Sequence, residues 1–230
     1  MSDLRPTSLD HVALWVADRD AIADLCCSHL GMHVIERTER FTLIGADARR
    51  GKLTLFNAEG PREPGALVAT ILRVSDLEKA VAALPESLEL ERRDDGVVEF
   101  DAPEGFRLGL VERETDLDYD LDHVVVRVED ADAAAAAYEQ LGFERDGHRA
   151  VVAGKWLTFE GGGEPEGDDP LLNHLAVLCD SAEAVEREAR ELGVEVVDVV
   201  DAANTLAVFV WTPSRVKLEY VEHKASFSLV

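Results

Sequence analysis

Apolar and polar residues alternate in short runs at the start of this chain, and a segment with helical spacing follows the first run. Residues 10–16 alternate and are rich in β-branched side chains, which predicts a strand. Residues 18–30 have helical spacing, and Gly31 stands where a helix commonly ends. Short strands are then predicted at residues 34–37, 41–45 and 52–56. The opening of the chain therefore predicts one βαβββ module.

The same order of elements returns three more times. The second module follows the turn-rich residues 57–65, with a strand at 67–74, a helix at 76–84 and strands at 88–92, 97–100 and 107–111. The third has a strand at 124–128, a helix at 131–141 and strands that end at Phe159, before a linker at 161–169. The fourth has a strand at 174–178, a helix at 181–192 and strands at 196–200, 206–210 and 216–221.

Motifs also repeat between the two halves of the chain, which indicates a duplication. The tetrapeptide Leu-Asp-His-Val at residues 9–12 returns at 121–124. Residues 103–112 align without gaps on residues 213–222. We therefore expect two domains, of residues 1–115 and 116–230.

The composition is that of a globular protein with a strongly acidic surface. Apolar residues make up 47% of the chain, and no apolar run approaches the roughly 18 residues that a membrane-spanning helix needs. The 47 acidic residues outnumber the 23 basic ones, which gives a formal net charge of −24. Such a charge repels phosphate and anionic lipid, so we expect neither a nucleic-acid nor a membrane partner. A salt-rich host cytoplasm and a GC-rich genome would both produce this bias, and the sequence leaves both open.

The cysteines and the N-terminal residues indicate a cytoplasmic protein. Cys26, Cys27 and Cys179 are odd in number and have no CxxC spacing, which argues against a disulfide framework and a thiolate zinc site. Residues 1–6 contain no apolar signal core. We therefore expect a reducing, cytoplasmic environment.

Repeated βαβββ units that open with Leu-Asp-His-Val and close their first helix with Gly resemble the vicinal oxygen chelate superfamily. That group includes glyoxalase I, type I extradiol dioxygenases, fosfomycin-resistance enzymes and bleomycin-binding proteins. The resemblance implies an α+β fold, in which four βαβββ modules pair into two tandem cup-shaped domains with mixed sheets. Because the superfamily spans several chemistries and some metal-free binders, the fold alone does not give the function.

Three residues of the second half match the metal ligands of two-domain extradiol dioxygenases, in which only the C-terminal cup holds the metal. They are His123 on the first strand of that half, His174 at the start of its second module, and Glu219 on its last strand. The resemblance implies Fe(II) first, with Mn(II) or Zn(II) as alternatives. The first half keeps His11 but has Thr70 and Gly109 at the other two positions. We therefore expect a metal-free first domain and a structural role for His11.

The sequence departs from the dioxygenase pattern around these ligands. Phe209 stands where such enzymes commonly carry a hydrogen-bonding tyrosine, and residues 156–160 lack the histidine that assists proton transfer. His148 is a candidate substitute as a catalytic residue, with a solvated turn histidine as the alternative. Glu160 is a candidate fourth metal ligand or base, with a solvated acid at the strand end as the alternative. His223 either faces the cup or lies in a frayed end of the last strand. Candidate walls of a substrate pocket are Trp156, Phe209 and Trp211, which would equally serve as core residues.

Three functions remain open from the sequence. The first is a metal-dependent, ring-cleaving dioxygenase that acts on a small aromatic vicinal diol. The second is a glyoxalase-like isomerase or lyase, which usually uses four protein ligands and a glutamate base. The third is a non-catalytic binding or resistance protein that holds a small aromatic molecule. Four modules can complete two cups in one chain, so both a monomer and a homodimer are compatible with the sequence.

Overall fold

Four segments of the chain each form a strand, a helix and three further strands, as the sequence predicts. The computed structural model describes residues 3–163 and 169–230, so residues 164–168 of the predicted linker lie outside the described residues. The first segment forms β1 (Ser8–Val16), α1 (Arg19–His29), β2 (His33–Arg37), β3 (Phe41–Asp47) and β4 (Arg50–Asn57). The second forms β5 (Leu67–Val74), α2 (Leu77–Ala82), β6 (Glu91–Arg92), β7 (Val98–Asp101), the 3₁₀ turn η1 (Pro103–Gly105) and β8 (Arg107–Glu112).

The second half of the chain repeats this order. The third segment forms β9 (Asp120–Val128), α3 (Ala131–Gln140), β10 (Glu144–Asp146), β11 (Arg149–Val152) and β12 (Lys155–Gly161). The fourth forms β13 (Leu172–Leu178), α4 (Ala182–Glu191), β14 (Val196–Asp201), β15 (Thr205–Trp211) and β16 (Lys217–His223). The α+β class and the repeated glyoxalase-type modules that we predicted are confirmed.

A short polar side chain begins each of the four α-helices. The side chains of Asp18, Asp76, Asp130 and Ser181 accept hydrogen bonds from backbone N–H groups of the first turn. These groups have no partner inside the helix, so the caps stabilise each start by about 1 kcal/mol. The position of every helix after its opening strand is thus encoded locally.

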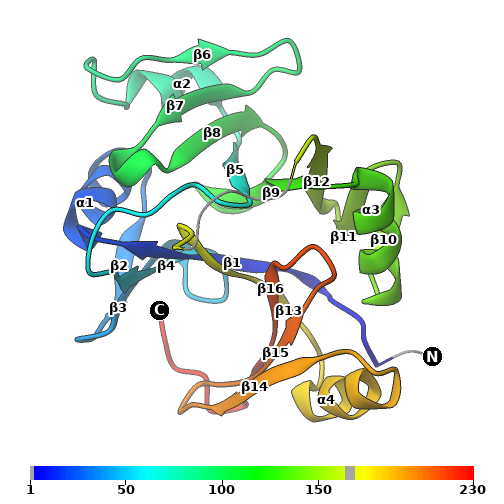
Figure 1. The fold of residues 1–230 in the computed structure, drawn as a ribbon. Coiled ribbons are helices and arrows are strands. Elements are labelled where there is room, and N and C mark those ends of the chain that lie inside the picture. The colour runs from blue at the N-terminus through cyan, green and yellow to red at the C-terminus, as the bar shows by residue number, and fades with distance from the viewer. Residues whose placement is uncertain (1–2, 164–168) are drawn as a thin grey trace.

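The modules pair across the two sequence halves. One mixed sheet has the strand order β14-β15-β16-β13-β1-β4-β3-β2 and so joins the first segment to the fourth. The other has the order β10-β11-β12-β9-β5-β8-β7-β6 and joins the second segment to the third. In Figure 1 the cyan and green strands of the second sheet lie above the first sheet, whose strands come from the blue and the yellow-to-red parts of the chain. Residues 113–119, between the two sequence repeats, connect two strands of one sheet.

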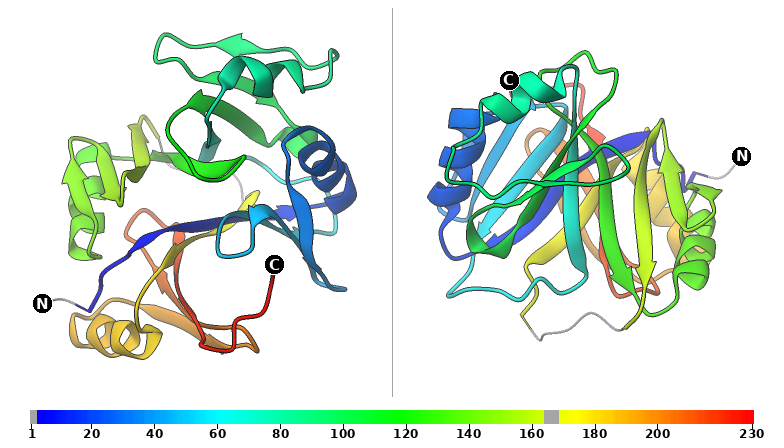
Figure 2. Two further views of the ribbon diagram at one scale, coloured as in Figure 1. Left: turned by 180° about the vertical axis from the view of Figure 1, so that it is seen from behind. Right: turned by 90° about the horizontal axis from the view of Figure 1, so that it is seen from above.

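Both sheets share one hydrophobic core. Val12 and Leu14 of β1 are fully buried in the same cluster as Val126 of β9, and the two layers are seen from two further sides in Figure 2. The hydroxyl of buried Tyr220 donates a 2.6 Å hydrogen bond to the carbonyl oxygen of Leu141, which ties the last strand to the end of α3. The opposite face of each sheet carries its own small apolar cluster, and the candidate site lies on that face of the first sheet.

Candidate metal centre

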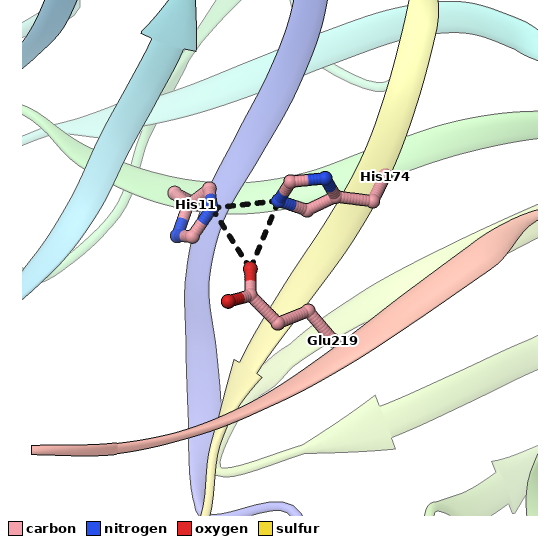
Figure 3. Close-up of side chains that lie close together, drawn as sticks. All are labelled: His11, His174 and Glu219. Carbon is pink, nitrogen blue, oxygen red and sulfur yellow. Dashed lines mark hydrogen bonds and ion pairs between the residues drawn. The ribbon is translucent and has the colours of Figure 1, made fainter. Parts of the chain in front are cut away.

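Two histidines and a glutamate meet on three neighbouring strands of the first sheet. His11 lies on β1, His174 on β13 and Glu219 on β16, and all three point to the same place (Figure 3). The register explains the meeting, because Ala176 lies opposite His11 on one side and opposite Glu219 on the other. The two Nε2 atoms are 3.0 Å apart, and Glu219 Oε2 lies 3.2 Å from His11 Nε2 and 2.9 Å from His174 Nε2.

The residue before each histidine fixes the orientation of its ring. His11 Nδ1 lies 2.7 Å from Asp10 Oδ2, and His174 Nδ1 lies 2.9 Å from Asn173 Oδ1. An Nδ1–H that donates to an oxygen leaves Nε2 free as an acceptor or a metal ligand. Both rings therefore present Nε2 to the point where Glu219 also arrives.

A buried lysine supports Asp10 from behind. Lys52 Nζ donates to Asp10 Oδ1 at 2.8 Å and to the carbonyl oxygen of Ala48 at 2.9 Å. Burial opposes ionisation of Asp10, but the charge of Lys52 and the contact with His11 outweigh burial and lower its pKa. Asp10 is thus an anion that both orients His11 and favours positive charge on it.

The three groups at the centre have strongly perturbed pKa values. Burial opposes charge on His11, but Asp10 and Glu219 outweigh it and raise the pKa of His11 to about 9. Burial is also the largest cause at His174, and there it prevails over Glu219, so the pKa of His174 is lowered. Burial would raise the pKa of Glu219, but the charge of His174 and the bonds to both histidines hold it well below its usual range. The metal-free centre therefore favours a charged His11, a neutral His174 and an ionised Glu219.

This arrangement fits a divalent metal ion. The candidate ligand atoms of the trio all lie within 4.8 Å of one another. Glu219 Oε2 is buried, and its close contacts with the two histidine Nε2 atoms lack the geometry of a full hydrogen bond. A buried carboxylate oxygen without such a bond is costly, and one cation between the three ligands would satisfy it. Two imidazoles and one carboxylate suit Fe(II), Mn(II) or Zn(II) and leave further coordination positions open.

Aromatic rings surround His174. The ring of Phe209 meets it edge-on at 5.2 Å between centroids, and the ring of Phe56 lies at 6.2 Å. Phe56 in turn packs against Trp15 at 5.3 Å and against Phe41 at 5.7 Å. All four rings are partly exposed, so they form an apolar wall that solvent, or a ligand, can reach.

The structure separates His123 from the other two members of the trio that the sequence predicted. His123 lies on β9 in the second sheet, where its Nδ1 is 2.7 Å from Asp122 Oδ2 and its ring stacks on Trp156 at 4.7 Å. It is not near His174, because β13 pairs with β1 and not with β9. His11, for which we expected a structural role, lies beside His174 and Glu219 instead. The metal-ligand role of the new trio is a proposal developed below.

The matching face of the second sheet has lost the other two ligands. Gly109 occupies the position of Glu219, as the sequence alignment indicates. The register of β9 with β5 makes Ala69, rather than Thr70, the counterpart of His174, because Ala69 lies opposite Val125 as His174 lies opposite Ala13. A Cβ atom at Gly109 would come within 2.4 Å of Ile71 Cδ1, so apolar packing fills that position. His123 is the single ligand-type residue that this copy keeps.

The other predicted site residues lie apart from the trio, with one exception. Phe209 contacts His174, as described above. His148 precedes β11 in the second sheet, with 58% of its side chain exposed and Nε2 3.5 Å from Asp132 Oδ1. Trp156 and exposed Glu160 are also in the second sheet. Trp211 is 38% exposed at the end of β15, with its ring 5.8 Å from Lys217 Nζ.

His223 faces the site from the end of β16. Its Nε2 lies 3.8 Å from Asp10 Oδ1, and its ring stacks on Phe227 at 4.3 Å. Sequence reasoning left the orientation of His223 open and missed Trp15, Phe41 and Phe56. Period-two spacing from His11 through Ala13 to Trp15 is the signal that places Trp15 on the face of the predicted ligands.

Two sheets of repeated βαβββ units around a His-His-Glu cluster define a tandem glyoxalase-type protein. The family model described as Glyoxalase/Bleomycin resistance protein/Dioxygenase superfamily matches residues 8–110 and 120–220. The chain belongs to this superfamily, whose proteins bind small-molecule substrates. None of the curated proteins matches the chain in sequence.

Solved structures share this fold at low sequence identity. A putative dioxygenase from Bacillus subtilis has a TM-score of 0.79 and 19% identity, over 97% of this chain and 87% of that one. Glyoxalase I from Zea mays has a TM-score of 0.73 and 17% identity, over 94% of this chain and 92% of that one. The cppA protein from Streptococcus pneumoniae has a TM-score of 0.64 and 13% identity, over 95% and 100%. At such identities the likeness concerns the fold. No helix in the described part of the chain is long and apolar enough to cross a membrane.

Proposed function

We propose that this chain is a metal-dependent dioxygenase that opens the ring of a small aromatic vicinal diol. The observation that carries the proposal is the convergence of two imidazole nitrogens and one carboxylate oxygen within 2.9 to 3.2 Å, beside partly exposed aromatic rings. His11, His174 and Glu219 would hold the metal, with Fe(II) as the first expectation. The two vicinal oxygens of a catechol would chelate a metal held there, and its charge would lower the pKa of the catechol hydroxyl groups.

The count of protein ligands favours this chemistry over a glyoxalase-like reaction, which usually employs four. The strand on the other side of β1 is β4, and its residues level with His11 and Ala13 are Lys52 and Thr54. Lys52 is already bound to Asp10, and Phe56, the next residue on that face, packs against aromatic rings. Among the described residues, the trio is the one group of His, Cys, Asp and Glu side chains with metal-site spacing. Two or more coordination positions would then remain for substrate.

The other side chains of the face would bind and orient the substrate. Phe209 and Phe56 present ring edges and faces on two sides of His174, which suits a flat aromatic molecule. Asp10 keeps Nε2 of His11 directed at the centre, with Lys52 holding Asp10 in turn. The protein from Bacillus subtilis that shares this fold is described as a putative dioxygenase, and that likeness supports the proposal.

The experiment is a substrate screen on protein purified without air and loaded with Fe(II). We expect catechol-dependent oxygen uptake and ring-cleavage absorbance, both lost in the His174→Ala variant. The matched control is His123→Ala, which removes the equivalent histidine of the second sheet and should keep the activity. Isomerisation of the adduct of methylglyoxal and a thiol, without oxygen uptake, would overturn the dioxygenase proposal and indicate a glyoxalase-like enzyme. Binding of catechols with no metal uptake would also overturn the dioxygenase proposal and indicate a non-catalytic binding protein.

A further inference from the structure

We propose that the face of the second sheet around Trp156 is a binding site for a small planar carboxylate, separate from the metal centre. Two guanidinium groups converge on this one indole. The Cζ atoms of Arg113 and Arg149 lie 5.1 and 5.0 Å from its ring centroid, while the ring of His123 stacks on it in a near-parallel plane, at 10°. Arg113 follows β8 and Arg149 begins β11, so strands on both sides of β9 supply the charges.

The positive charges of this cluster are only partly neutralised. Asp122 is fully buried and contacts Arg73 at 2.7 Å, Arg113 at 3.2 Å and His123 at 2.7 Å. One carboxylate therefore serves two guanidiniums and an imidazole. The guanidinium of Arg149 has no hydrogen bond or ion pair with any residue that the structure describes, and its interaction there is with the Trp156 ring. With Arg73, Arg113 and Arg149 against Asp122, the cluster carries two surplus positive charges in a chain of net charge −24.

The chemistry of the face selects a flat anion. Arginine forms paired hydrogen bonds to carboxylates, and both Arg113 and Arg149 are exposed. Beside them lie the small apolar residues of the same face, Ala69, Ile71, Val97, Val111 and Val125. Gly109 and Ala69 stand at the counterparts of Glu219 and His174. A metal ion would therefore find no second or third protein ligand here. An aromatic carboxylate would place its charge between the guanidiniums and its ring against the partly exposed indole of Trp156.

Benzoate is the probe, and benzamide is its neutral, equally shaped control. The readout is the indole N–H resonance of Trp156, assigned by its loss in Trp156→Phe, during titration of the full chain. We expect benzoate to shift this signal saturably and benzamide not to do so. Arg149→Gln and Arg113→Gln should each weaken benzoate binding roughly tenfold or more. Arg127→Gln, a change at an exposed arginine of β9 without a contact to Trp156, should leave it unchanged.

The outcomes separate this site from the metal centre. In the Glu219→Gln variant, benzoate should still shift the Trp156 signal, whether or not the dioxygenase proposal is correct. Equal binding of benzamide would overturn the carboxylate site, as would full benzoate affinity in both arginine variants. Loss of the Trp156 response in Glu219→Gln, with retention in Arg149→Gln, would mean that the ligand binds at the trio instead.

Discussion

His11 and His174 are 163 residues apart in the chain, yet their Nε2 atoms lie 3.0 Å from each other. The contact exists because β1 and β13 are antiparallel neighbours at the centre of one sheet. One candidate ligand from the first module and two from the fourth therefore meet in one cluster. Each half of the duplicated sequence supplies an incomplete set.

Removing His11 should abolish tight metal binding, because only two protein ligands, His174 and Glu219, would remain. We expect about one iron or manganese per chain in the parent protein and a near-complete loss in His11→Ala, measured by plasma mass spectrometry after purification without air or chelators. His123→Ala is the matched control and should keep its metal. The reverse result would restore the trio that the sequence predicted.

Changing Asp10 to Asn should weaken the metal centre without removing a ligand. The amide can still accept the hydrogen bond from His11 Nδ1, but the negative charge that makes the ring a stronger ligand is lost. Changes of such supporting groups typically cost about 10- to 100-fold in metal affinity. Competition with a fluorescent chelator measures this, and Asp130→Asn, at a distant helix cap, is the control. Unchanged affinity would show that Asp10 supports folding alone.

Metal binding near neutral pH should release one proton. Because the pKa of metal-free His11 is raised to about 9, this ring is protonated there and must lose its proton to become a ligand. His174 has a lowered pKa and Glu219 a strongly lowered one, so both are already deprotonated. Affinity should therefore rise with pH up to about 9. Calorimetry in buffers of different ionisation enthalpy counts the protons, and a value near zero would contradict the charge pattern.

Gly142 should tolerate a side chain much less well than Gly96. Both have positive φ, +88° and +86°, so an added methyl group costs about 1 kcal/mol at either position. At Gly142 the new Cβ would also lie 1.6 Å from the carbonyl oxygen of Leu4, whereas nothing lies within 4 Å at Gly96. We expect Gly142→Ala to lower the unfolding free energy by more than about 3 kcal/mol, measured in urea. Equal losses in both variants would mean that the Leu4 segment moves aside easily.

Local patterns predicted most of the secondary structure. Asp18, Asp76, Asp130 and Ser181 mark helix starts by side-chain bonds within one turn, and alternation marks the strands. The predicted strand at 88–92 shrinks to Glu91–Arg92, since the exposed residues before it lack a neighbouring strand. These features depend on interactions between residues close in sequence, which a single sequence records directly.

The pairing of the modules could not be predicted in the same way. His11 and His123 occupy equivalent places in a duplicated motif, so the motif cannot tell which of them meets His174 and Glu219. The pairing depends on which opening strand neighbours β13, and that is decided by packing over more than 150 residues. The following residues do differ, however. Trp15 continues the face of His11 with an aromatic ring, whereas Arg127 continues the face of His123 with a charge. That contrast favours His11 as the histidine beside the proposed aromatic substrate.

The placement of the ligands on the first and last modules has a consequence for synthesis. A growing chain exposes His11 early, but Glu219 leaves the ribosome only when nearly all of the sheet strands have been made. Until β16 pairs with β13, no lasting three-ligand centre can exist. A product truncated before β16 lacks Glu219, so the proposed metal could load only after the chain is nearly complete.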